Sequence, residues 1–110
     1  MHPDLPTGLY PFWFWNDHLT ADEIRRQIKE MSDQGIKGFF IHPRQGLGQP
    51  YLSEAFFEMV DAAVDAAEQH GLKVHLYDEY PYPSGIAGGE VVLGQPQFAA
   101  TRLRQESRQV

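Results

Sequence analysis

The feature that most constrains the fold is a helix-to-strand junction that occurs twice. The tripeptide Gly-Ile-Lys at 35–37 returns as Gly-Leu-Lys at 71–73, 36 residues later. Each glycine follows a segment with helical periodicity and precedes a short apolar run rich in aromatic or β-branched residues. Glycine in this place is typical of the left-handed residue that ends a helix. The repeat therefore predicts helices and strands in alternation.

The segment before the first junction has the signals of a helix start. Thr20 is placed to cap a helix, and Glu23 is placed to reach back to it, which together make a capping box. Ile24, Ile28 and Met31 then recur at the spacing of a helix with one buried face. We predict an amphipathic helix that ends at the first glycine of the repeat.

The second helix is predicted from the same signals. Ser53 is the expected cap, and the expected apolar stripe is Phe57, Val60, Val64 and Ala67. This helix ends at the second glycine of the repeat.

Three apolar runs are the predicted strands, and they cover residues 10–16, 38–42 and 73–78. None of them alternates cleanly between apolar and charged residues, so we expect strands that are covered on both faces. The helical connections are long enough for parallel strands and are expected to be right-handed. The sequence therefore predicts an α/β fold with a parallel βαβαβ unit.

Two architectures continue such a unit, a (β/α)8 TIM barrel and an open doubly wound sheet. A nucleotide-binding open sheet calls for a glycine-rich turn after its first strand, but the turn here reads "WNDHLT". We therefore favour the barrel. A complete barrel takes about 250 residues, so residues 1–110 are expected to be the N-terminal segment of a barrel domain, with its first three strands.

Composition excludes several classes of function. The formal net charge is −6, with fifteen acidic residues against nine Lys and Arg, which argues against nucleic acid as a partner. There is no cysteine, so neither a disulfide framework nor thiolate chemistry is expected. We see no signal peptide and no apolar run that approaches the roughly 18 residues of a membrane span. These patterns favour a cytoplasmic protein without a membrane partner.

Candidate binding residues follow the predicted strands, because ligands sit at the carboxyl ends of parallel strands. Asn16 follows the first strand, His42 and Arg44 end the second, and Asp78 and Glu79 end the third. The 36-residue repeat pairs His42 with Asp78 on neighbouring strands. Because neighbouring side chains alternate between faces, we expect one of the two acids to face the ligand and the other to anchor the loop.

The segment "DEYPYPSGIAGG" at 78–89 is predicted to be the rim of this face. Its prolines restrict the tyrosines before them to extended conformations, and its glycines allow a sharp turn and close backbone approach. Tyr82 and Trp15 are the expected stacking residues, Trp15 because it lies nearest the end of its strand. A sugar ring has an apolar face and a rim of hydroxyls, so aromatic, amide and charged side chains together fit a carbohydrate.

The combination "PFWFWNDHLTADEIRRQIKEMSDQGIKGFFIHPRQGL", "PYLS" and "LYDEYPYPSGIAGG" resembles the start of the catalytic barrel in α-L-rhamnosidase-like glycoside hydrolases, family 106 and its relatives. The resemblance covers roughly residues 10–92. It implies a (β/α)8 domain that acts on glycosides, with calcium bound in some members. The positions that match are Trp15, Asn16, His42, Arg44, Asp78, Glu79, Ser84 and Gly85.

The resemblance also implies a parent several times longer than this chain, with most catalytic carboxylates on later strands. We therefore expect a fragment of a glycoside hydrolase that carries sugar-binding residues but has no activity by itself. Glu79 is the candidate catalytic acid, no residue is assigned to a metal, and calcium is a cofactor only of the parent. Two alternatives stay open: a non-catalytic carbohydrate-binding remnant, and a small α/β protein that self-associates through open sheet edges.

Overall fold

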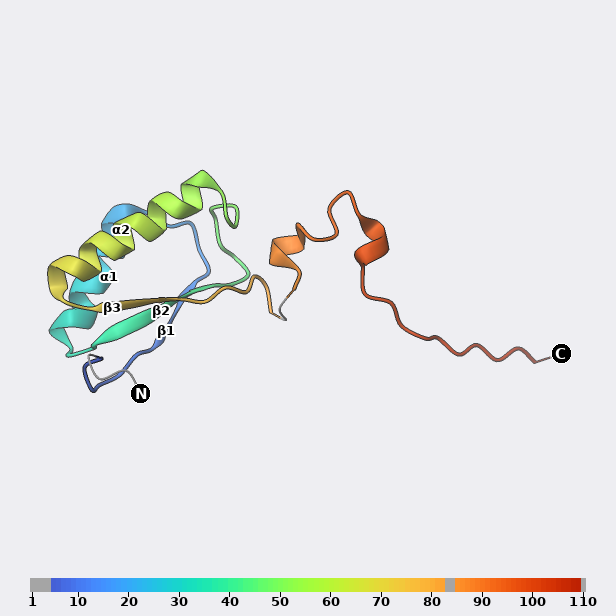
Figure 1. Cartoon of the computed structure of the whole chain (residues 1–110), viewed down its shortest axis with the longest axis horizontal. Coiled ribbons are helices and arrows are strands. Elements are labelled where there is room, and N and C mark those ends of the chain that lie inside the picture. Colours follow the sequence, from blue (N-terminus) through green and yellow to red (C-terminus); the bar gives the residue numbers. More distant parts are fainter. Residues whose placement is uncertain (1–4, 83–84, 110) are drawn as a thin grey trace.

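A computed structural model describes residues 5–82 and 85–109 of the chain (Figure 1). Three strands and two α-helices alternate, and two short 3-10 helices follow them. Residues 99–109 form neither helix nor strand and lie exposed. The elements are β1 (Phe12–Trp15), α1 (Ala21–Asp33), β2 (Gly38–Pro43), α2 (Glu54–His70), β3 (Lys73–Leu76), η1 (Ala87–Gly89) and η2 (Pro96–Phe98).

The three strands form one parallel sheet in the order β1-β2-β3. Both helices lie against the same face of this sheet, as Figure 1 shows. The predicted α/β class and the parallel βαβαβ unit are thus confirmed. The strands were also expected to be covered on both faces, and this is wrong within the part of the chain that the structure describes. On the uncovered face, Phe12 and Phe14 are 54% and 47% exposed.

The predicted ends of α1 are confirmed, with one difference. The Thr20 hydroxyl accepts a hydrogen bond from the backbone N–H of Glu23, and Gly35 takes the left-handed conformation with φ +81°. The reciprocal half of the capping box does not form, because Arg26 and Gln27 both donate to the Glu23 carboxylate. The charged guanidinium and the neutral amide on the next turn together outcompete a single backbone N–H.

The ends of α2 are also as predicted, but its buried face is not. Ser53 caps the helix by accepting from the N–H of Phe56, and Gly71 ends it with φ +69°. The predicted stripe is rotated, because Phe57 and Val64 are 48% and 42% exposed. Phe56 is buried in place of Phe57, with its ring edge-to-face on Trp15. The buried side chains of α2 are Phe56, Val60, Ala63, Ala66 and Ala67.

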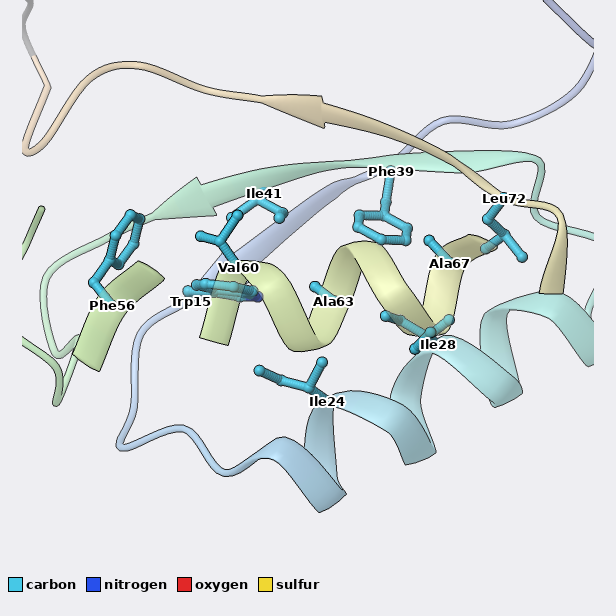
Figure 2. Packing of buried hydrophobic residues seen from close by; sticks show 11 residues of the cluster. Trp15, Ile24, Ile28, Phe39, Ile41, Phe56, Val60, Ala63, Ala67 and Leu72 are labelled. Carbon is cyan, nitrogen blue, oxygen red and sulfur yellow. The ribbon is translucent and has the colours of Figure 1, made fainter. Parts of the chain in front are cut away.

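The core lies between the sheet and the two helices (Figure 2). The sheet contributes Trp15, Phe39 and Ile41, and α1 contributes Ile24 and Ile28; all five are at most 1% exposed. Burying side chains of this kind stabilises the fold by about 1.5 to 3 kcal/mol each. The side chains that α2 contributes to this core include the small residues Ala63 and Ala67, which let the helix approach the sheet closely (Figure 2). This core fixes where the three strands end.

Candidate functional site

A cavity of about 820 Å³ lies where the three strands end. It is bordered by the last residues of β1 and β2, by the residue that follows β3, and by the segment after it. This is the edge at which parallel sheets bind ligands, and the volume is within the range of ligand pockets. The lining residues are Phe14, Asn16, His42, Pro43, Arg44, Gln45, Tyr77, Pro81 and Tyr82.

Four residues that the sequence singled out line this cavity: Asn16, His42, Arg44 and Tyr82. Asn16 and Arg44 are exposed at the cavity, and Tyr82 is 78% exposed. His42 differs from them because its side chain is only 8% exposed. The cavity lining thus combines exposed polar groups with one buried imidazole.

Aromatic rings hold the His42 imidazole. It stacks on Tyr77 with ring centroids 3.9 Å apart, and it meets Phe12 and Phe14 at 5.2 Å each. Side chains two residues apart share a face of a strand, and Phe14 pairs with His42 in the register of β1 and β2. The uncovered face of the sheet therefore carries Phe14, His42 and Tyr77 as neighbours.

The pairing of His42 with Asp78 that the repeat predicted is wrong. The register of β2 and β3 pairs Ile41 with Leu76, and the Tyr77 N–H then donates to the Ile41 carbonyl. The next residue, His42, therefore lies beside Tyr77. The reason is that the second junction is one residue shorter, since β2 begins three residues after its glycine and β3 begins two residues after its own.

Arg44 is fixed by its backbone and by a ring. Its N–H donates to the Trp15 carbonyl at 3.0 Å, which extends the ladder between the first two strands. Its guanidinium carbon lies 4.8 Å from the centroid of Phe14. A guanidinium over an aromatic face gains a cation–π attraction and keeps its N–H edge available. Arg44 thus offers planar donors at the cavity.

Glu79 and Asp78, which follow β3, have different surroundings, but neither lines the cavity as we expected of one of them. The Tyr77 hydroxyl donates to the Glu79 carboxylate at 2.7 Å, and this hydrogen bond raises the pKa of Tyr77. Asp78 is exposed, and its charge adds to burial in raising the pKa of Tyr51. Neither acid lines the 820 Å³ cavity. Glu79 is thus connected to the cavity only by its hydrogen bond with Tyr77.

The stacking role predicted for Trp15 is wrong for this cavity. Its side chain is 1% exposed and packs edge-to-face on Trp13 and Phe56, on the face of the sheet that the helices cover (Figure 2). It lies beside a separate cavity of about 290 Å³ that includes Thr20 and Gln27. Strand alternation explains the error, since the residue before it, Phe14, takes the position on the open face.

Sequence reasoning missed four of the lining residues: Phe14, Pro43, Gln45 and Pro81. Phe14 could have been found from alternation once Trp15 was assigned to the core. Pro81 precedes Tyr82 and could have been found with it. Nothing in the sequence marked the other two. Tyr77 was expected only as one of several rings with an apolar face, and its place beside His42 follows from the register of β2 and β3.

Ser84 and Gly85 are the two remaining residues that were predicted at the rim. Ser84 lies outside the described residues. Gly85 is exposed, with φ +99°, and does not line the cavity. Further along the rim, Tyr80 contacts Tyr51 with ring centroids 4.9 Å apart, which ties the segment to the start of α2.

The loop after β1 and the loop after β2 are held together by contacts near Asn16. Gln49 is 6% exposed; its amide group donates to the Leu19 carbonyl at 2.7 Å and accepts from the Leu19 N–H at 3.1 Å. Gly46 has φ +101°, and a Cβ there would come closer than 3.0 Å to the Asn16 carbonyl oxygen. These contacts hold the residues after β1 against the residues after β2.

The calcium site that the resemblance implies is not formed by these residues. Calcium takes six to eight oxygen ligands, mostly from carboxylates and carbonyls. Between residues 5 and 82 and between 85 and 109, no group of three or more His, Cys, Asp and Glu side chains is arranged to hold a metal ion. No step of the chemistry is therefore assigned to a metal here.

The structure is a parallel βαβαβ unit with a cavity at the carboxyl ends of its strands. Comparison with protein-family models, characterised proteins and solved structures finds no match to this chain. Among the described residues, no helix is both long and apolar enough to cross a membrane. The function is accordingly argued from the geometry of the cavity.

Proposed function

We propose that this chain is the first part of a (β/α)8 catalytic domain of a glycoside hydrolase of the α-L-rhamnosidase-like type, and that its cavity binds a sugar. The observation that carries the proposal is the lining of the 820 Å³ cavity. The lining contains three aromatic rings, from Phe14, Tyr77 and Tyr82. It also contains three groups that can form hydrogen bonds: the Asn16 amide, the His42 imidazole and the Arg44 guanidinium.

This combination suits a sugar for physical reasons. The C–H-rich face of a pyranose packs against an aromatic ring, and its hydroxyls require donors and acceptors around the rim. Asn16 offers both a donor and an acceptor, and Arg44 offers donors only. The resemblance of residues 10–92 to the rhamnosidase-like barrel supports the same class of ligand.

Within this proposal Glu79 is the candidate catalytic acid; it lies outside the cavity lining, where its carboxylate accepts a hydrogen bond from the lining residue Tyr77. A glycosidase also needs a second carboxylate across the scissile bond. The cavity lining contains no Asp or Glu, so a second carboxylate would come from strands of a longer parent.

Sugar binding by the 110-residue chain tests the proposal. We expect methyl α-L-rhamnoside, followed by NMR chemical shifts, to perturb the amides of Asn16, Arg44 and Tyr82. Asn16→Ala is expected to weaken binding about threefold to tenfold, the cost of one lost hydrogen bond. Asp65→Asn, on the exposed side of α2, is the matched control and is expected to leave binding unchanged. Chemical-shift changes confined to residues outside the cavity, or no binding of any glycoside tested, would contradict the proposal.

A second candidate, self-association, is favoured by the uncovered face of the sheet. Phe12, Phe14 and Leu76 are 54%, 47% and 66% exposed, and β1 and β3 each have one edge without a partner strand among the described residues. Exposed apolar faces and open edges promote association. Sedimentation of the chain at micromolar concentration tests this: an oligomer that Phe12→Ser weakens would support it, and a strict monomer would contradict it.

A further inference from the structure

The charge of the cavity lining differs from that of the chain. The formal net charge of the chain is −6, yet none of the nine residues that line the 820 Å³ cavity is acidic, and Arg44 is its one formal charge. A cavity walled by low-dielectric rings focuses such a charge on whatever enters it. Arg44 is therefore the charge that an entering ligand meets in the lining itself, while Glu79 and Asp78 lie outside the lining and raise the pKa of Tyr77.

Arg44 also differs from the cations of α1. Arg25, Arg26 and Lys29 each form an ion pair with an acid one turn away on the same helix. Within residues 5–82 and 85–109, no carboxylate lies within ion-pair distance of Arg44. Its charge is thus available to a ligand.

The geometry of Arg44 suits one kind of anion. The guanidinium carbon of Arg44 lies 4.8 Å from the centroid of the Phe14 ring, and a guanidinium presents its N–H groups along a planar edge. This edge forms two parallel hydrogen bonds with a carboxylate. The anchored backbone of Arg44 reduces the entropy lost when such a pair forms.

The remaining polar groups suit neutral hydroxyls. Asn16, Gln45 and Tyr82 line the cavity and carry no charge. The Tyr77 hydroxyl already donates its proton to Glu79, which lies outside the lining, so this hydroxyl has no proton left to donate to a ligand. One carboxylate-binding edge beside several hydroxyl-binding groups matches a sugar ring that bears a carboxylate.

From these observations we infer that the cavity prefers an acidic sugar, of the uronic acid class, over its neutral counterpart. This inference rests on the proposed carbohydrate-binding function. It adds the charge of the ligand and the residue that recognises this charge. Arg44 is the specificity-determining residue.

The experiment compares three probes on the 110-residue chain by NMR titration: D-galacturonate, D-galactose and acetate. The two sugars differ at one carbon, which carries a carboxylate in one and a hydroxyl in the other. Because Arg44 is exposed, we expect galacturonate to bind about threefold to tenfold more tightly than galactose at low salt. High salt is expected to reduce the difference, since exposed charges are screened.

Two variants of Arg44 identify the group responsible. Arg44→Gln is expected to abolish the preference, whereas Arg44→Lys retains the charge and is expected to retain part of it. Arg25→Gln on α1 is the matched control and should leave the preference intact. The amide spectrum of each variant shows whether the fold is kept.

The outcomes separate the inference from the proposed function. Equal binding of both sugars, unchanged in Arg44→Gln, would overturn the inference and leave sugar binding in place. Binding of acetate at Arg44 without binding of either sugar would overturn the proposed function. A preference for galacturonate over both other probes that is lost in Arg44→Gln supports both.

Discussion

The imidazole of His42 stacks on the phenol ring of Tyr77, with centroids 3.9 Å apart and planes 20° from parallel. The hydroxyl of Tyr77 in turn donates a hydrogen bond to the Glu79 carboxylate at 2.7 Å. A buried strand-end residue is thereby linked, through one ring and one hydrogen bond, to the candidate catalytic acid. Tyr77 is consequently the residue whose substitution reports most directly on how the site is held.

Tyr77→Phe is expected to change how stability depends on pH. The hydrogen bond to Glu79 raises the pKa of Tyr77 above its ordinary value of 10.0. A raised pKa in the folded state means that the bond stabilises the fold fully below pH 10.0 and ceases to do so as pH rises through the folded value. The stability lost by Tyr77→Phe is therefore expected to shrink as pH rises above 10.0, as measured by urea unfolding at several pH values.

Tyr82→Phe is the control for this pH effect, because Tyr82 is 78% exposed. It is expected to unfold as the unmodified chain does at each pH. A stability difference between the parent chain and Tyr77→Phe that is constant from neutral to alkaline pH would show that the hydroxyl does not act through Glu79.

Gln49→Ala is expected to loosen the two loops beneath the cavity. It leaves the N–H and the carbonyl of Leu19 without the buried amide that pairs with both. Each unsatisfied group costs about 1 to 3 kcal/mol, so we expect a loss of about 2 to 4 kcal/mol in the free energy of unfolding. Hydrogen exchange at the Leu19 amide should quicken.

Gln45→Ala is the matched control for this change, since Gln45 is exposed on the same loop. We expect it to alter the free energy of unfolding by no more than about 0.5 kcal/mol. Equal effects of the two substitutions would mean that the Gln49 amide does not tie the loops.

Gly46→Ala is expected to be more damaging than the same change at Gly35. Both glycines have positive φ, +101° and +81°, so alanine is strained at either. Only at Gly46 would the new Cβ meet the Asn16 carbonyl, while at Gly35 no heavy atom lies within 4 Å. We expect losses of about 1 to 2 kcal/mol at Gly35 and about 2 to 4 kcal/mol at Gly46 by urea unfolding. Equal losses of stability at the two positions would indicate that backbone strain alone, without a clash with the Asn16 carbonyl, accounts for the effect at Gly46.

Local signals predicted the fold well because they act over a few residues. Thr20 and Ser53 cap their helices, and Gly71 ends the second one in the left-handed conformation, as their positions in the sequence indicated. Each of these roles depends on backbone groups within one helical turn. The order of strands and helices followed from the same signals.

Side-chain faces and register were harder to predict because they depend on distant partners. His42 lies beside Tyr77 and not beside Asp78, because one junction is a residue shorter than the other. Trp15 lies in the core because the two helices cover its face of the sheet, which its strand alone does not reveal. A shift of one residue exchanges the two faces of a strand. Four of the predicted residues therefore line the cavity at this edge, whereas Trp15 lies in the core.

The purified 110-residue chain is expected to show no glycosidase activity. Hydrolysis requires a proton donor at the leaving oxygen and a second carboxylate, about 5 to 9.5 Å away, on the other side of the sugar. Three acids follow the strands: Asp17, Asp78 and Glu79. Asp17 accepts a hydrogen bond from the N–H of His18 at 2.7 Å, and none of the three lines the 820 Å³ cavity.

Aryl α-L-rhamnosides and a mixed panel of aryl glycosides provide the assay for this last prediction. We expect rates equal to background, because Glu79, held by the Tyr77 hydroxyl, has no second carboxylate facing it in the cavity lining. Glu79→Gln serves as the matched variant and should give the same background rate. Turnover that Glu79→Gln abolishes would instead show that this short chain brings its own catalytic pair together, which requires a rearrangement of Asp17 or Asp78 toward the cavity.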